Sequence, residues 1–113
     1  MSKLFFFGLV WAKILILVDG KGMTLYLYTK DTPGVSNCSA GCLAKWPPLT
    51  AESLGNITVG TGVDKTKLGL ADLADGKKIV TYNKMPLYYW VNDSKPGDTT
   101  GQNVGGVWYV VAP

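Results

Sequence analysis

The first part of the chain is almost continuously apolar. Residues 4–18 read LFFFGLVWAKILILV and are interrupted only by Lys13. Aromatic and β-branched residues favour extended structure, so this pattern predicts strands around 4–11 and 13–18 that are apolar on both faces. Such a strand needs cover from its own core or from a neighbouring subunit, because an exposed one is a template for aggregation. We call residues 1–17 the N-terminal segment, and its candidate assembly residues are Leu4, Phe5, Phe6, Phe7, Leu9, Val10, Trp11, Ile14 and Ile16.

This segment has two other interpretations. A secretory leader remains open, and a membrane-spanning helix is disfavoured. A secretory leader begins with a positive residue and an apolar run, but cleavage after Ala12 would make an unusually short leader without a convincing small-x-small site. A membrane-spanning helix needs about twenty apolar residues, and Lys13 interrupts this run. We therefore expect an assembly strand or a leader, with membrane contact only through such a leader.

Behind this segment, residues 18–113 alternate between short apolar runs and turn-rich stretches. Asp75-Gly76 is a strong hairpin signal between two of the runs. The 14 Gly and 6 Pro also favour many turns and short elements. The sequence thus predicts a single small antiparallel all-β domain. Its strands are expected around 24–29, 69–73, 77–82, 86–91 and 107–111, with irregular stretches around 32–66 and 93–106.

A strand-turn unit occurs twice, in residues 18–49 and 80–113. Each copy contains Tyr-x-aromatic-x-x-Asp followed by a Pro-Gly turn, which predicts two related halves. Aromatic residues at alternate strand positions share one face, so Leu25 and Leu87 are expected on the other face. The motif is Tyr26, Tyr28 and Asp31 in the first copy and Tyr88, Trp90 and Asp93 in the second, with turns at Pro33, Gly34, Pro96 and Gly97. At a spacing of 62 the copies also match at Val18/Val80, Met23/Met85, Leu25/Leu87 and Trp46/Trp108.

The two motif aspartates stand where their strands end. A short carboxylate there commonly accepts hydrogen bonds from the backbone of the following turn, which is the role we expect for Asp31 and Asp93. Metal ligation is the alternative, and Asp98 is the only hint of a second carboxylate ligand.

The aromatic residues of the repeats also allow two interpretations. Alternate aromatics commonly build β cores and cross-strand pairs, and we favour this role. A path for electron hopping is the alternative. Its residues would be Tyr26, Tyr28, Tyr88, Trp90 and Trp108.

Cys38 and Cys42 are the only cysteines. At positions i and i+4 of a short helical turn, which Ser36 or Asn37 could cap, they lie within reach of a disulfide. That pairing suits an oxidising compartment and is the interpretation we favour. The alternatives are a redox-active pair and a copper(I) site completed by Met23 or Met85.

Composition excludes several classes of protein. The chain has no His and a single Glu, so ordinary hydrolase triads are excluded and we expect no enzyme activity. All eleven basic residues are lysines, they are scattered, and the net charge is only +3. Nucleic-acid binding is therefore not expected, and no cofactor is predicted.

The segments around the motif resemble a known family. The blocks at 18–38, 42–49, 62–69 and 80–113 are similar to the bacterial secreted-repeat lipoproteins, which carry a Tyr-x-aromatic-x-x-Asp motif. The resemblance implies export to the cell surface or beyond and implies no particular activity. Family members often carry a lipidated cysteine after a signal peptide, whereas no cysteine precedes Cys38 here.

Three functional hypotheses follow from these features. The first is a non-enzymatic extracytoplasmic structural protein that polymerises with copies of itself, a neighbour accepting the N-terminal strand by strand addition. The second is a redox, copper-handling or electron-transfer protein of the cell envelope. The third is a module that binds a wall polymer or glycan through exposed aromatic residues.

Overall fold

The computed structural model describes residues 2–8, 15–60 and 62–112 of the chain. Short strands are the main regular element of these residues, which confirms the predicted all-β class. In chain order the elements are β1 (Ser2–Gly8), β2 (Leu15–Asp19), β3 (Tyr26–Tyr28), α1 (Ala40–Lys45), η1 (Leu54–Asn56), β4 (Ile57–Val59), η2 (Lys65–Lys67), β5 (Leu68–Asp72), β6 (Lys78–Tyr82), β7 (Met85–Pro86), η3 (Val104–Gly106) and β8 (Trp108–Val110).

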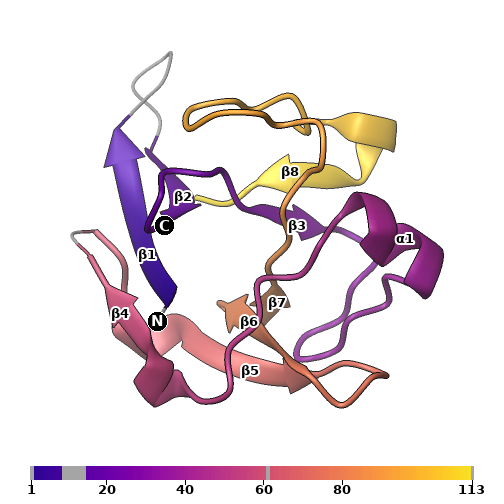
Figure 1. Cartoon of the computed structure of the whole chain (residues 1–113), viewed down its shortest axis with the longest axis horizontal. Helices are drawn as coiled ribbons and strands as arrows, with labels where there is room; N and C mark the ends of the chain where they lie inside the picture. The colour runs from indigo at the N-terminus through magenta and orange to yellow at the C-terminus, as the bar shows by residue number, and fades with distance from the viewer. Residues whose placement is uncertain (1, 9–14, 61, 113) are drawn as a thin grey trace.

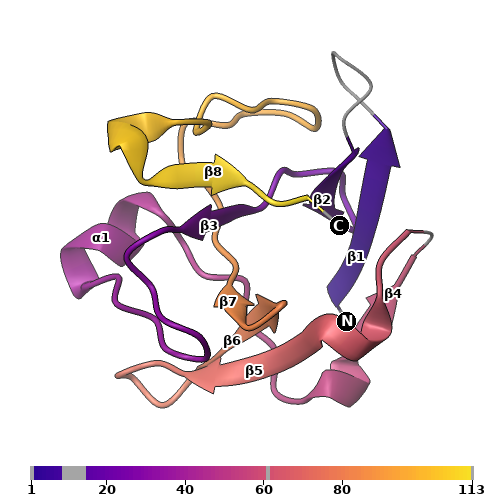
Figure 2. The ribbon, with the colours of Figure 1, turned by 180° about the vertical axis from the view of Figure 1, so that it is seen from behind.

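The strands form three small sheets around a common interior (Figure 1). One sheet has the order β5-β6-β7 and another pairs β3 with β8, and both are antiparallel. The third has the order β2-β1-β4, in which β1 is antiparallel to β2 but parallel to β4. Seen from either side, β8 and β5 lie on opposite sides of the molecule (Figures 1 and 2).

Several predicted boundaries differ from the structure. The stretch 32–66 was expected to be irregular apart from a short helical turn at the cysteines, yet it also contains β4. This strand forms because β1 supplies a parallel partner from far away in sequence. The strand expected at 86–91 is reduced to β7. There the chain changes partners at successive residues, since Tyr88 pairs with Tyr26 while the N–H of Tyr89 donates to the Pro47 carbonyl at 2.7 Å.

Helix α1 begins two or three residues later than expected. Its N-cap is Ser39, whose side chain accepts a hydrogen bond from the N–H of Cys42. The expected caps are engaged elsewhere: the Ser36 hydroxyl is bonded to Tyr88, and Asn37 binds Asp31 and the Lys30 carbonyl. Ser36 and Asn37 do not cap α1 because both hold the preceding loop against the core.

The strand register corrects one repeat equivalence. Val18 pairs with Thr24, and the corresponding pair in the second copy is Thr81 with Pro86. Val18 thus corresponds to Thr81 and not to Val80. The hairpin of the second copy is one residue shorter, so the spacing changes from 63 before the hairpin to the 62 that relates Leu25 to Leu87.

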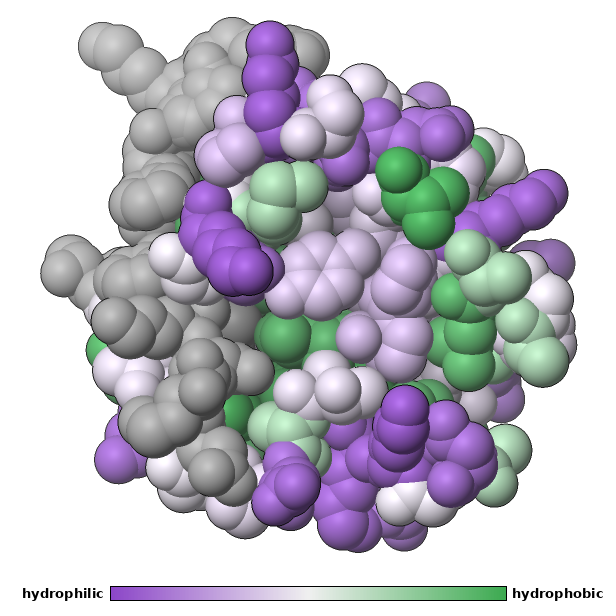
Figure 3. Space-filling view, in the orientation of Figure 1, coloured by the Kyte–Doolittle hydropathy of each residue, from purple (hydrophilic) through white to green (hydrophobic). Residues whose placement is uncertain are grey.

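The interior consists of two hydrophobic clusters, and each draws matching residues from both copies. Leu25 and Leu87 lie in one cluster and Tyr26 and Tyr88 in the other, which confirms that neighbouring motif positions point to opposite faces. Hydrophilic residues gather at the rim of the molecule, and paler or apolar residues occupy the centre of the face in Figure 3. The first cluster consists of Leu17, Leu25, Leu49, Val80, Tyr82, Leu87 and Val111, and the second of Tyr26, Cys38, Trp46, Ala71, Leu73, Ile79, Tyr88 and Trp108.

The predicted assembly strand is placed inside its own sheet. β1 contains Leu4, Phe5, Phe6 and Phe7, which are paired with 16–19 of β2. Its other edge pairs in parallel with β4. β2 crosses the expected domain boundary at residue 17, and Ile16 in it is buried. The remaining candidates Leu9, Val10, Trp11 and Ile14 lie outside the described residues.

Candidate functional site

The two motif tyrosines meet at the centre of the molecule. The N–H of Tyr26 donates to the Tyr88 carbonyl at 2.8 Å, and the N–H of Tyr88 donates back to the Tyr26 carbonyl at 2.9 Å. The two copies are thus joined by a reciprocal backbone pair of equivalent residues. Both tyrosine side chains are fully buried.

Each tyrosine hydroxyl binds the aspartate of the other copy. The Tyr26 hydroxyl donates to Asp93 Oδ2 at 2.6 Å, and the Tyr88 hydroxyl donates to Asp31 Oδ2 at 2.7 Å. These bonds are buried, and hydrogen bonds to charged acceptors are stronger than those between neutral groups. The motif is therefore completed only when both copies are present.

The second oxygen of each aspartate binds the following turn. The N–H of Asn37 donates to Asp31 Oδ1 at 2.6 Å, and both the N–H and the hydroxyl of Thr100 donate to Asp93 Oδ1, at 3.0 and 2.6 Å. The expected role of these carboxylates is confirmed. Asp98 accepts its bonds from Ser94 and Lys95 in its own turn. No group of three or more possible metal ligands occurs within the described part of the chain.

Burial sets the ionisation of this network. The pKa of Asp31 is raised by burial, although the Asn37 N–H and the Tyr88 hydroxyl act in the opposite direction by binding the carboxylate. Burial also raises the pKa values of Tyr26 and Tyr88, and the neighbouring carboxylates raise them further. Both phenols are consequently neutral donors over the whole neutral range.

Four aromatic rings form a continuous stack beside these tyrosines. Trp46 and Trp108, which are equivalent in the two copies, lie parallel at the middle of the stack with centroids 3.7 Å apart and 2° between their planes. Tyr28 stacks on Trp108 at 4.3 Å, and Trp90 stacks on Trp46 at 4.1 Å. The order Tyr28-Trp108-Trp46-Trp90 alternates between the copies, and we call these four residues the aromatic stack.

The two buried tyrosines contact the stack edge-on. The Tyr26 ring meets Trp46 at 5.5 Å and 80°, and the Tyr88 ring meets Trp108 at 5.2 Å and 88°. The central tryptophans are nearly buried, whereas Tyr28 and Trp90 at the ends are half-buried. All five residues of the predicted hopping path are brought together, and Trp46, which that path omitted, is the link between its two halves.

A glycine makes room for one of the tyrosines. A Cβ atom at Gly101 would lie 2.8 Å from Tyr26 Cζ, and the Gly101 N–H donates to the Tyr26 hydroxyl at 3.1 Å. Gly101 and Thr100 are not among the residues predicted from the sequence. Their signal is the spacing of 63 set by the Pro-Gly turns, which aligns them with Cys38 and Asn37.

The two Pro-Gly turns have equivalent backbones. The N–H of the residue after each turn donates across it, from Val35 to the Thr32 carbonyl at 2.9 Å and from Asp98 to the Lys95 carbonyl at 3.1 Å. Gly34 and Gly97 have φ of +74° and +91°, a conformation that a type II turn requires and that glycine adopts without strain. The predicted turns at Pro33-Gly34 and Pro96-Gly97 are thus present.

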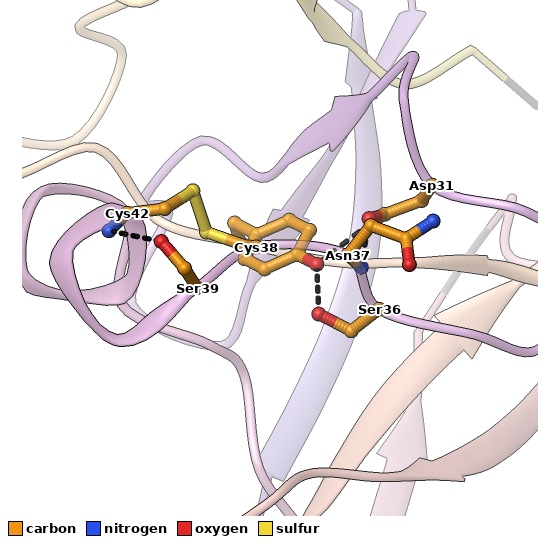
Figure 4. The surroundings of a disulfide bond; sticks show 7 residues. Asp31, Ser36, Asn37, Cys38, Ser39 and Cys42 are labelled. Atoms are coloured by element: carbon orange, nitrogen blue, oxygen red, sulfur yellow. Dashed lines mark hydrogen bonds between the residues drawn. A yellow bond between two sulfur atoms is a disulfide. The ribbon is translucent and has the colours of Figure 1, made fainter.

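Cys38 and Cys42 form a disulfide, as favoured from their spacing, with Cα atoms 5.2 Å apart. It ties the loop after Asp31 to α1, close to the Ser36–Tyr88 hydrogen bond (Figure 4). A copper(I) site at this pair is inconsistent with the structure, because both sulfur atoms are consumed in the bond and neither is a free thiolate.

These features define a two-copy repeat architecture: two copies of one small β unit that exchange tyrosine–aspartate bonds. A family model described as a secreted repeat of unknown function matches residues 15–50 and 69–112, and the chain belongs to this family. The matched copies begin before the expected starts at 18 and 80. Comparison with curated proteins and with solved structures gave no match.

The helices in the described residues are all too short or too polar to cross a membrane.

Proposed function

We propose that this secreted repeat protein is a non-enzymatic structural module of the cell exterior that assembles with copies of itself through β1. The observation that carries the proposal is the place of β1, which fills a slot between β2 and β4. β1 and β4 both lie outside the two matched repeats. The pair is therefore an addition to the repeat fold, and an added strand is available for a separate task.

The polar groups of the motif favour a structural role. The Tyr26–Asp93 and Tyr88–Asp31 bonds join the two copies, and the remaining aspartate oxygens bind the turns. Among the described residues, no buried side-chain nitrogen or oxygen lacks a hydrogen-bond partner. Groups that satisfy one another in this way stabilise a rigid unit, which favours a structural role for the motif.

Strand exchange explains how β1 can join two molecules although both its edges are paired. A second copy carries the same strand, so that strand fits the same slot in the same register. If β1 of each molecule enters the slot of the next, the contact is head-to-tail and builds an open filament. The proposed contact is therefore an exchange of β1 between molecules, in place of the strand addition expected from the sequence.

The experiment uses two variants that each carry one added cysteine, because Lys3 of β1 and Thr58 of β4 are paired residues. Cysteines on neighbouring strands lie within disulfide reach. When the Lys3→Cys and Thr58→Cys proteins are mixed at assembling concentration and oxidised, we expect a covalent heterodimer on non-reducing gels. The native cysteines do not interfere, since they are already bonded to each other.

The matched control is a chain of residues 15–113, which keeps both matched repeats. It should remain a folded monomer by light scattering and give no fibres in negative-stain images, whereas the full chain gives fibres. Fibres from the truncated chain, or a full chain that stays monomeric and forms no heterodimer, would contradict the proposal.

A further inference from the structure

The aromatic stack is suited to one-electron transfer from ring to ring. Tryptophan and tyrosine are among the side chains most readily oxidised by one electron, and electron transfer between them weakens steeply with distance. Ring centroids in the stack are 4.3, 3.7 and 4.1 Å apart, so successive rings are in van der Waals contact. Both end residues, Tyr28 and Trp90, are partly accessible to a reagent in solution.

We propose that the stack relays one-electron oxidation from its ends to Tyr26 and Tyr88, where a proton moves to the aspartate of the other copy. The reaction partner is a small one-electron oxidant, such as a metal complex, that meets Trp90 or Tyr28. This function is separate from assembly through β1, because no residue of the relay lies in β1 or β4.

The relay step conserves electrons and protons. The oxidant takes one electron from Trp90. Trp46 then gives an electron to Trp90 through the ring contact, so that Trp46 becomes the oxidised residue. Tyr26 then gives an electron to Trp46 while its phenolic proton moves along the 2.6 Å bond to Asp93 Oδ2. The products are the reduced oxidant, neutral Trp46, a Tyr26 phenoxyl radical and protonated Asp93. A later one-electron reductant reverses the step, and the proton returns to Tyr26.

The second copy repeats the same arrangement. Tyr28 contacts Trp108, the Tyr88 ring meets Trp108 edge-on, and the Tyr88 hydroxyl faces Asp31 at 2.7 Å. Direct contact between Trp46 and Trp108 lets an oxidation that begins at either end reach either tyrosine. Both phenols are fully buried and each donates to a carboxylate, so that carboxylate is the proton acceptor at hand when the phenol is oxidised.

A partly buried tyrosine of the second copy offers a control. The Tyr89 hydroxyl donates to Asp19 at 2.7 Å, and burial raises its pKa in the same way. Tyr89 belongs to neither the stack nor the edge-on pair. Tyr89→Phe therefore removes a comparable tyrosine–aspartate bond without touching the relay.

The experiment is flash oxidation of the folded full chain by a photoexcited ruthenium polypyridyl complex with a sacrificial acceptor. Electron paramagnetic resonance identifies the radical, and transient absorption follows its formation. We expect a tyrosyl radical in the wild-type protein and in Tyr89→Phe. It should be lost in the Tyr26→Phe/Tyr88→Phe variant and form more slowly in heavy water than in ordinary water.

Two further variants separate the relay from a merely structural role. Trp46→Phe keeps an aromatic ring but is harder to oxidise, so the Tyr26 radical should form more slowly although near-ultraviolet circular dichroism shows a folded core. Asp31→Asn/Asp93→Asn keeps a hydrogen-bond acceptor of much lower basicity, and the radical should then stay on tryptophan. The proposal is overturned if the radical forms on Tyr89 or Tyr109, or if these variants match the wild-type yield and rate.

Discussion

At the residue scale, each motif aspartate binds the turn of its own copy with one oxygen and the tyrosine of the other copy with the second. The sequence predicts correctly that Asp31 and Asp93 bind the following turns. It gives no sign that Tyr26 binds Asp93 and Tyr88 binds Asp31, because residues 67 and 57 positions apart are brought together only by tertiary packing. A motif read along the chain shows which residues matter, and the partner of each depends on how the copies pack.

The buried phenols make the protein sensitive to alkaline pH. Burial raises the pKa of Tyr26 and Tyr88 above the ordinary 10.0, whereas both ionise near the ordinary value once the chain unfolds. The stability they contribute is therefore fully present below pH 10 and is lost as the pH rises further. Urea unfolding at a series of pH values should show the unfolding free energy falling above pH 10, and phenolate absorbance should appear together with unfolding.

The Tyr26→Phe/Tyr88→Phe variant serves as the control for this titration. It lacks both groups, so its unfolding free energy should fall less steeply above pH 10 than that of the wild type. Equal slopes for the two proteins would contradict the assigned shift.

At the element scale, local signals predict strands and turns well, and long-range partners decide the rest. The hairpin at Asp75-Gly76 joins β5 to β6, and both Pro-Gly turns form as predicted. β4 was missed because three residues carry little periodicity and depend on β1 for pairing. The extent of β7 was overestimated because the residues after it pair with β3 and the Pro47 loop.

The disulfide and α1 are expected to support the stack from one side. The N–H of Trp46 donates to the Cys42 carbonyl at 2.9 Å, so the disulfide-bonded turn leads directly into the central tryptophan. Closing so short a loop restricts the unfolded chain only modestly, and the Cys38→Ser/Cys42→Ser variant should lose about 2 kcal/mol of unfolding free energy. Denaturant unfolding with and without dithiothreitol measures this loss.

The double-serine variant should not respond to the reductant, whereas the wild type should shift toward it. Near-ultraviolet circular dichroism would report any change in the packing of Trp46. An unchanged wild-type midpoint after complete reduction would show that the disulfide does not stabilise the fold.

At the scale of the whole molecule, the structure is one unit built from two incomplete copies. Each hydrophobic cluster contains equivalent residues of both copies, and the stack alternates between them. The internal repeat, the all-β class and the family could be predicted from the sequence. The alternation of the stack could not, since spacing along a strand says which face a ring occupies and not which ring it meets.

The interlocking of the copies explains why the same motif occurs twice in one chain. One copy alone would leave the hydroxyl of its tyrosine and one oxygen of its aspartate without their partners. Unpaired buried polar groups cost about 1–3 kcal/mol each. The second copy removes that cost, and the rigid unit that results carries both β1 for assembly and the stack for electron relay in our proposals.

A double-mutant cycle on the motif tests this interlocking most directly. Tyr26→Phe is combined with Asp93→Asn of the other copy and, as the matched comparison, with Asp31→Asn of its own copy, and unfolding free energies are measured in urea. We predict a coupling energy of about 1–3 kcal/mol for the cross-copy pair and near-additive effects for the pair within one copy. Strong coupling within the copy, with additive effects across copies, would contradict the account.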